Sequence, residues 1–65
     1  MIKINSNEVD FIENENLYEL LKRNDFNPEF VAVEVNENLV KRDNFKEHLL
    51  EDGAVVEVFS FVGGG

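Results

Sequence analysis

Hydrophobic and polar residues alternate at the start of the chain, a pattern typical of a β-hairpin. Ile2 and Ile4 occupy one face of a predicted strand, and Val9 and Phe11 repeat the two-residue period after a polar break. The break, residues 5–8, is rich in Asn and Ser, which tolerate the backbone of a tight turn. We therefore expect two strands joined by this turn.

The hydrophobic period then changes from two to 3.6, which indicates a helix. Leu17, Leu20 and Leu21 form one apolar stripe, and Asn16 followed by Glu19 has the spacing of a capping box. Two basic residues end the stripe, where the helix dipole favours them. A helix of two or three turns is unstable alone, so the leucines must pack on a sheet.

Three more strands are predicted after the helix. Residues 30–35 are dense in β-branched residues, and a very short strand at 39–40 follows a turn. Residues 43–50 are predicted as one or two helical turns that place apolar side chains inward: Phe45, Leu49 and, as a further candidate, Leu50.

The last predicted strand, residues 54–62, follows an Asp-Gly turn. Its alternation places Val56 and Val58 on one face and Val55, Glu57, Phe59 and Phe61 on the other. This order of elements favours an α+β fold, in which one sheet covers one helix and its other face stays open.

Composition limits the chain to one small domain. With 65 residues it can build a single core, and such a core without disulfides or metal supplies about 3–5 kcal/mol. The formal charge of -8 repels phosphate backbones and anionic lipid headgroups, so we expect no nucleic acid or membrane partner. A basic protein surface is a better partner.

The absence of cysteine excludes disulfides, thiolate metal sites and a cysteine nucleophile. The chain shows no signal peptide at its start and no apolar run of the ~20 residues that a membrane span needs, so the expected location is cytoplasmic.

Residues that could perform catalysis are scarce. Ser6 and Ser60 have no recognisable base, and the single imidazole, His48, is expected on the surface or half-buried. The acidic residues do not have the spacing of a calcium loop and are interpreted as a solvated face: Glu13, Glu15, Glu51 and Asp52. We expect no catalytic residue, no metal site and no bound cofactor.

The carboxyl-terminal end carries the clearest chemical signal. Gly63, Gly64 and Gly65 add nothing to a core, but a segment without side chains can enter a channel too narrow for a Cβ atom. The α-carboxylate of Gly65 has a typical pKa of ~3.5, is ionised at neutral pH and could attack the α-phosphorus of ATP. An inert end is the alternative.

The whole chain resembles the ThiS family of sulfur carriers in thiamine biosynthesis. The resemblance rests on the order and spacing of five segments: Asn16-Leu17-Tyr18-Glu19-Leu20-Leu21, Val31-Ala32-Val33-Glu34-Val35-Asn36, Val40-Lys41-Arg42, Asp52-Gly53, and Val56-Glu57-Val58-Phe59-Ser60-Phe61-Val62-Gly63-Gly64-Gly65. It implies a ubiquitin-like β-grasp fold over residues 1–62, with a mixed sheet of four to five strands on one main helix, and a flexible glycine tail at 63–65.

The resemblance also implies a function for the tail. An E1-like adenylyltransferase of the ThiF type would activate Gly65 with its own ATP and Mg²⁺, and a cysteine desulfurase relay would supply sulfur for a thiocarboxylate. Thiazole synthase, of the ThiG type, would take that sulfur. Gly64 would complete the required glycine pair, and Gly63 would add reach.

The sequence departs from the family pattern at three places. Lys41 stands where a proline is common, Phe45 replaces a common tryptophan, and the first turn reads Asn-Ser-Asn-Glu. These changes bear on turn rigidity, packing and partner matching more than on the chemistry of the end group.

Phe59, Phe61 and Val62 are predicted to bind a partner enzyme, because aromatic side chains on an open sheet face commonly anchor protein contacts. Packing of the phenylalanines within the fold is the alternative. Arg42 is expected to pair with a neighbouring carboxylate, and contact with a partner is its alternative role.

Other functions stay open at this point. A sibling carrier for molybdopterin or amino-acid biosynthesis would use the same end group with a different acceptor enzyme. A ubiquitin-like modifier would join it to lysines of other proteins, and a plain interaction domain would not use it at all.

Overall fold

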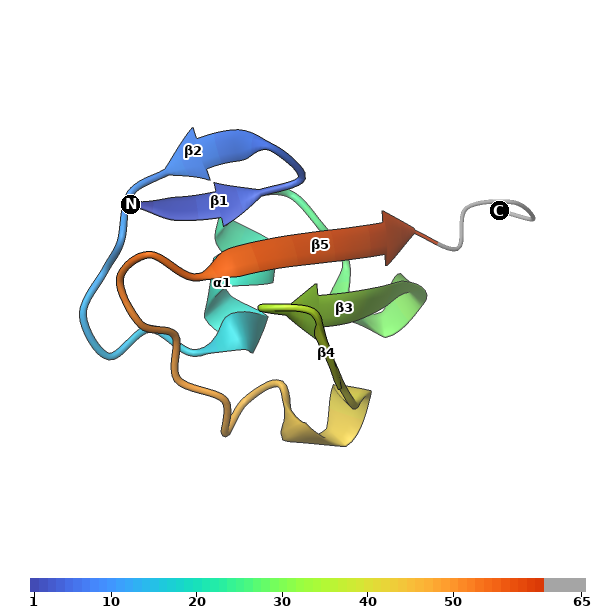
Figure 1. Cartoon of the computed structure of the whole chain (residues 1–65). Helices are drawn as coiled ribbons and strands as arrows, with labels where there is room; N and C mark the ends of the chain where they lie inside the picture. Colours follow the sequence, from blue (N-terminus) through green and yellow to red (C-terminus); the bar gives the residue numbers. More distant parts are fainter. Residues whose placement is uncertain (61–65) are drawn as a thin grey trace.

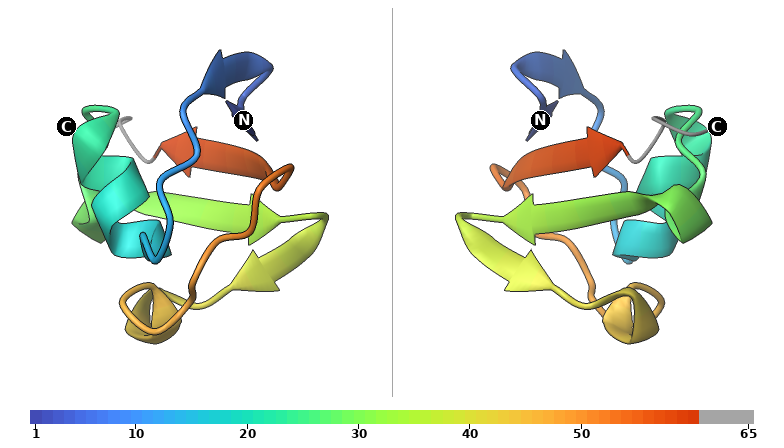
Figure 2. Two further views of the ribbon diagram at one scale, coloured as in Figure 1. Left: turned by 90° about the vertical axis from the view of Figure 1, so that its left-hand side faces the viewer. Right: turned by 90° about the vertical axis from the view of Figure 1, so that its right-hand side faces the viewer.

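Residues 1–60, which the structure describes, form one mixed five-stranded sheet with one α-helix packed against it (Figures 1 and 2). The structure is a computed structural model. The strand order is β2-β1-β5-β3-β4. Along the chain the elements are β1 (Ile2–Ile4), β2 (Asn7–Val9), α1 (Leu17–Arg23), the 3-10 helix η1 (Pro28–Phe30), β3 (Val31–Val35), β4 (Asn38–Val40), the 3-10 helix η2 (Arg42–Asn44) and β5 (Val55–Ser60). The predicted α+β class is confirmed.

The predicted hairpin of β1 and β2 is confirmed, with a tighter turn than expected. Its turn consists of Asn5 and Ser6, whose φ angles are 48° and 74°. Two successive positive φ angles match the twist of the flanking strands. Because two residues suffice, Asn7 and Glu8 belong to β2 and not to the turn. Phe11 lies beyond the strand.

Helix α1 begins with the predicted capping box. The Glu19 N–H donates to Asn16 Oδ1 at 2.8 Å, and the Asn16 N–H donates to Glu19 Oε1 at 3.1 Å. These bonds satisfy N–H groups that have no partner within the helix. Leu17, Leu20 and Leu21 are fully buried, so the apolar stripe faces the sheet as predicted.

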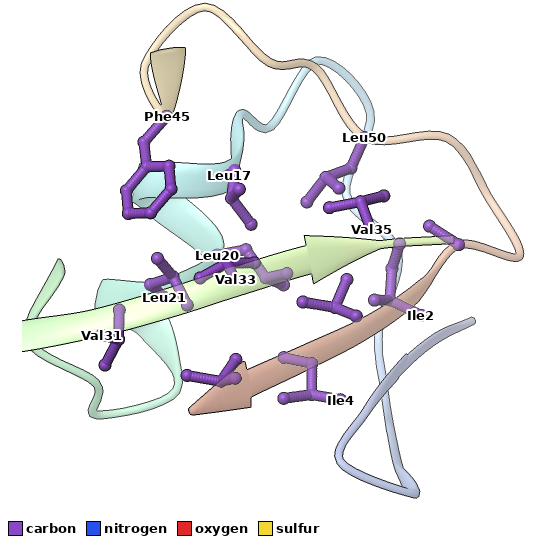
Figure 3. Close-up of a cluster of buried hydrophobic side chains, with 13 residues drawn as sticks. Ile2, Ile4, Leu17, Leu20, Leu21, Val31, Val33, Val35, Phe45 and Leu50 are labelled. Carbon is purple, nitrogen blue, oxygen red and sulfur yellow. The ribbon is translucent and has the colours of Figure 1, made fainter. Parts of the chain in front are cut away.

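The core fills the space between α1 and the sheet (Figure 3). Val33 and Val56, on the two neighbouring strands β3 and β5, are fully buried, and each strand contributes its alternate residues. Burial of one such side chain stabilises the fold by about 1.5–3 kcal/mol. The core residues are Ile2, Ile4, Leu17, Leu20, Leu21, Val31, Val33, Val35, Phe45, Leu50, Ala54, Val56 and Val58.

The segment between β4 and β5 differs from its prediction. Phe45 is 2% exposed and Leu50 5% exposed, as expected, but Leu49 is 59% exposed, so its inward prediction was wrong. Leu49 forms a β-bridge with Asn16, and the Leu50 N–H donates to the Glu15 carbonyl at 3.1 Å. In extended backbone, successive side chains point to opposite faces, so burial of Leu50 turns Leu49 outward.

Strands β3 and β4 form a second hairpin at the opposite edge of the sheet from β1 and β2. Its turn is Asn36 and Glu37, with φ angles of 52° and 71°, so Asn38 lies in β4 and not in the turn. Phe30, predicted as the first residue of β3, belongs to η1 and is exposed.

Strand β5 lies at the centre of the sheet, between β1 and β3 (Figure 1). It runs parallel to β1 and antiparallel to β3. The first and last strands are therefore parallel neighbours in the middle of the sheet, as expected for a β-grasp fold. Val56 and Val58 are buried on the helix side, also as predicted.

Candidate functional site

Strand β5 leads directly to the residues that the sequence assigns to chemistry. Its last residue, Ser60, is also the last described residue. Phe61, Val62 and the three glycines, Gly63, Gly64 and Gly65, lie outside the described part of the chain. Their roles, and the division between domain and tail at residue 62, stay predictions.

Two asparagines hold β5 through side-chain bonds to its backbone. Asn5 Oδ1 accepts from the Val58 N–H at 2.8 Å, and Asn5 Nδ2 donates to the Val58 carbonyl at 3.2 Å. Asn36 Oδ1 accepts from the Val55 N–H at 3.0 Å. A side-chain amide can thus replace a backbone partner at a strand end. The sequence marked both asparagines only as turn residues.

Phe59 lies on the face of the sheet opposite the helix. Its side chain is 49% exposed, and its Cα partner on β3 is Ala32, whose small side chain leaves the ring uncovered on that side. Val55, on the same face of β5, is 40% exposed. The predicted face assignment of Phe59 is therefore correct within β5, and its role in partner binding stays a prediction.

This open face contains further residues that the sequence analysis did not single out. Leu39 of β4 is 68% exposed and lies opposite Glu34 of β3, which in turn lies opposite Glu57 of β5. We call the surface formed by Ala32, Glu34, Leu39, Val55, Glu57 and Phe59 the open face. The pairing register brings these residues together, and the hydrophobic alternation within each strand does not by itself fix the partners across strands.

Arg42 does not form the predicted pair with a carboxylate. Its Nε donates to the Pro28 carbonyl at 3.2 Å, and its Nη2 donates to the Val31 carbonyl at 3.5 Å. The guanidinium therefore bridges η2 to the first residue of η1 and to the first residue of β3. Arg42 has a structural role in this position.

Glu15 is not part of a solvated acidic face, so its interpretation was wrong. Its side chain is 8% exposed, and its carboxylate accepts from Arg23 Nε at 2.8 Å and from Arg23 Nη2 at 2.9 Å. Arg23 Nη2 also donates to the Asp10 carbonyl at 2.8 Å. The hydrogen bonds to Glu15 raise the pKa of the Arg23 guanidinium above its usual range.

A groove of about 610 Å³ lies between β4 and the segment that follows η2. His48, Leu39 and Leu49 are among its lining residues, and His48 is half-buried, as predicted. The His48 carbonyl accepts from the Leu17 N–H at 2.9 Å, which fixes this segment to α1. The lining contains no serine or cysteine nucleophile for His48 to activate.

Residues 1–60 contain no cluster of three or more His, Cys, Asp or Glu side chains placed to hold a metal ion. Over the same residues, no helix is long and apolar enough to cross a bilayer.

The sequence matches the ThiS family over residues 2–65. A crystal structure of the thiamine biosynthesis protein ThiS from Geobacter metallireducens aligns with a TM-score of 0.76 at 34% identity, over 98% of this chain and 97% of that one. A solution NMR structure of a thiamine biosynthesis protein from the same organism gives a TM-score of 0.77 at 34% identity, over 98% and 86%. The uncharacterized protein ycf40 of Porphyra purpurea is 36% identical over 64 residues, which cover 98% of this chain and 90% of that protein.

Proposed function

Because this chain belongs to the ThiS family, we propose that it carries sulfur as a thiocarboxylate on Gly65. The family consists of small sulfur carriers of thiamine biosynthesis, and the chain is such a carrier and not an enzyme. The observation that carries the proposal is the extent of the family match, which continues through the glycines to residue 65.

The proposed chemistry occurs on the terminal carboxylate, in two partner-catalysed stages. An E1-like adenylyltransferase presents ATP and Mg²⁺, and the Gly65 carboxylate attacks the α-phosphorus while pyrophosphate leaves. A persulfide sulfur from a cysteine desulfurase relay then attacks the acyl-adenylate and displaces AMP. A second thiol cleaves the resulting S–S bond, which releases the thiocarboxylate and leaves a disulfide on the relay protein. Thiazole synthase takes the sulfur.

The fold supports this role because β5, the strand that precedes the glycines in the sequence, is held firmly in the sheet. β5 is bonded on both sides, and Asn5 fixes the backbone of Val58, two residues before Ser60. Enzymes that recognise the domain would therefore find Ser60, the end of β5, at a defined position. In this proposal ATP is bound by the partner enzyme and not by this chain. We place the carrier in the cytoplasm together with that enzyme.

We propose that Phe59, together with Phe61 and Val62, binds the adenylyltransferase or thiazole synthase. The Phe59 ring is half-exposed, so its replacement by alanine removes partner contact area at little cost to the core. Phe59→Ala is expected to weaken enzyme binding about tenfold. Leu49→Ala, which removes a similarly exposed side chain from outside the open face, is the matched control.

Mass spectrometry of the intact chain tests the proposed end-group chemistry. The chain is incubated with the adenylyltransferase from the same genome, ATP, Mg²⁺, a cysteine desulfurase and cysteine. The expected product has one oxygen atom replaced by sulfur, and a chain lacking Gly64 and Gly65 remains unchanged. No mass change in the intact chain would refute the proposal.

Two other outcomes would favour the alternative functions. Isopeptide adducts on lysines of other proteins would indicate a modifier. A thiocarboxylate that forms but does not donate sulfur to thiazole synthase would indicate a sibling carrier with another acceptor enzyme.

A further inference from the structure

Two glutamates face each other across the centre of the open face. Glu34 of β3 and Glu57 of β5 are Cα partners in the antiparallel pair, so their side chains leave the sheet on the same side, and both are half-buried. Directly opposed residues have Cβ atoms about 4.5–5.5 Å apart, and like charges at this distance destabilise a sheet. The fold therefore contains an unfavourable charge pair at the middle of the open face.

No cation within residues 1–60 neutralises this pair. The ion pairs in that part of the chain are Met1 with Asp52 and Arg23 with Glu15, and both lie elsewhere. Lys3, the basic residue of β1 on the same side of the sheet, is in register with Val55 and makes no ion pair with either glutamate.

Exposed apolar side chains lie beside the two carboxylates. Val55 and Phe59 flank Glu57 along β5, and Leu39 lies beside Glu34 on β4. These three side chains are 40%, 49% and 68% exposed, in that order. The arrangement is a negative centre with an apolar rim, and it is complementary to a protein surface that presents one cation within an apolar patch.

We propose that Glu34 and Glu57 together bind an arginine side chain of the adenylyltransferase. This inference rests on the proposed function and names the contact by which the enzyme recognises the open face. A planar guanidinium can donate to two carboxylates at once, whereas an ammonium acts as a compact point charge. Its weak hydration and its affinity for aromatic faces also suit a position beside Phe59.

This role gives the two glutamates opposite effects on binding and on folding. When either carboxylate is replaced by the neutral amide, the like-charge repulsion disappears and the free domain becomes more stable. The same change removes a hydrogen-bonded charge from the interface and weakens binding. A purely structural role for the glutamates would not separate the two effects in this way.

The test compares Glu34→Gln, Glu57→Gln and Glu47→Gln. All three remove one negative charge, but Glu47 is an exposed residue of the segment that is hydrogen-bonded to α1, on the helix side of the sheet. Binding to the adenylyltransferase from the same genome is measured by calorimetry at about 0.15 M salt, where long-range attraction is screened. Adenylation of the unchanged chain and urea unfolding of every variant are measured in parallel.

We expect Glu34→Gln and Glu57→Gln each to weaken binding about tenfold and to unfold at higher urea than the unchanged chain. Glu47→Gln is expected to bind within about twofold of it. If the unchanged chain is adenylated and all three variants bind alike, the inference is wrong and the proposed function stands. If the unchanged chain neither binds the enzyme nor becomes adenylated, both are wrong.

Discussion

Removal of the Arg23 guanidinium is expected to cost more stability than removal of the Glu15 carboxylate. The two side chains share two hydrogen bonds, but the Glu15 side chain is 8% exposed and the Arg23 side chain 30%. Arg23 also keeps a 2.8 Å bond to the Asp10 carbonyl when Glu15 is changed. Within residues 1–60 no other cation pairs with this carboxylate, and little of it is exposed to water that could replace the guanidinium. The cost of breaking the pair should therefore depend on which member is removed.

The expected magnitudes follow from this asymmetry. Arg23→Met leaves a buried carboxylate without a cation, at a cost of about 3 kcal/mol. Glu15→Gln lets the guanidinium recover water and retains an acceptor, so we expect a loss of about 1–2 kcal/mol. A domain of this size has a total stability of about 3–5 kcal/mol, so Arg23→Met should unfold partly at 25 °C and melt ~10–25 °C lower.

Urea unfolding followed by circular dichroism measures both variants, and the double variant completes the cycle. In the unchanged chain, the raised pKa of the Arg23 guanidinium means that the stabilisation from its positive charge is present at neutral pH and is lost only as the pH rises through that pKa in strong alkali. Equal losses for the two single variants, or a loss below about 0.5 kcal/mol for Arg23→Met, would refute the reasoning.

Further substitutions test three local features of the fold. Leu50→Ala is expected to lower the free energy of unfolding by about 2–4 kcal/mol, and Leu49→Ala by less than about 0.5 kcal/mol. Urea titrations measure both losses, and a larger loss for Leu49→Ala would contradict the burial described for the two residues. Asn16→Ala should cost about 1 kcal/mol through loss of the capping box, while Asn16→Asp should preserve the melting temperature. Asn5→Gly keeps the positive φ but removes the amide, so hydrogen exchange of the Val58 N–H should accelerate; unchanged exchange would show that this bond does not hold β5.

The features that the sequence predicts well depend on residues close together in the chain. The capping box of Asn16 and Glu19 lies within one helical turn, and the leucines of α1 repeat at helical spacing. The alternation in β5 is local in the same sense, so it placed Phe59 on the correct face. Each of these signals can be evaluated without knowledge of the rest of the fold.

The features that the sequence does not predict depend on distant partners. Leu49 points outward because its segment pairs with the residue before α1, and Glu15 is buried because Arg23 returns to it from the end of the helix. The residues that surround Phe59 are likewise set by strand register: Glu34 faces Glu57 only once β3 and β5 have paired. Periodicity alone carries no information about these pairings.

The central position of β5 also determines when the sheet can form during folding. Its contacts with the first hairpin join residues far apart in the chain: Asn5 and Val58 are separated by 53 positions. Such a topology has a high contact order. The chain loses the entropy of closing this large loop before the contacts between β5 and the first hairpin can stabilise the sheet. The two hairpins can form early, but until β5 inserts between them they have no common sheet. We therefore expect a folding transition state in which β5 is already docked, and low-populated intermediates in which only the hairpins and α1 are structured.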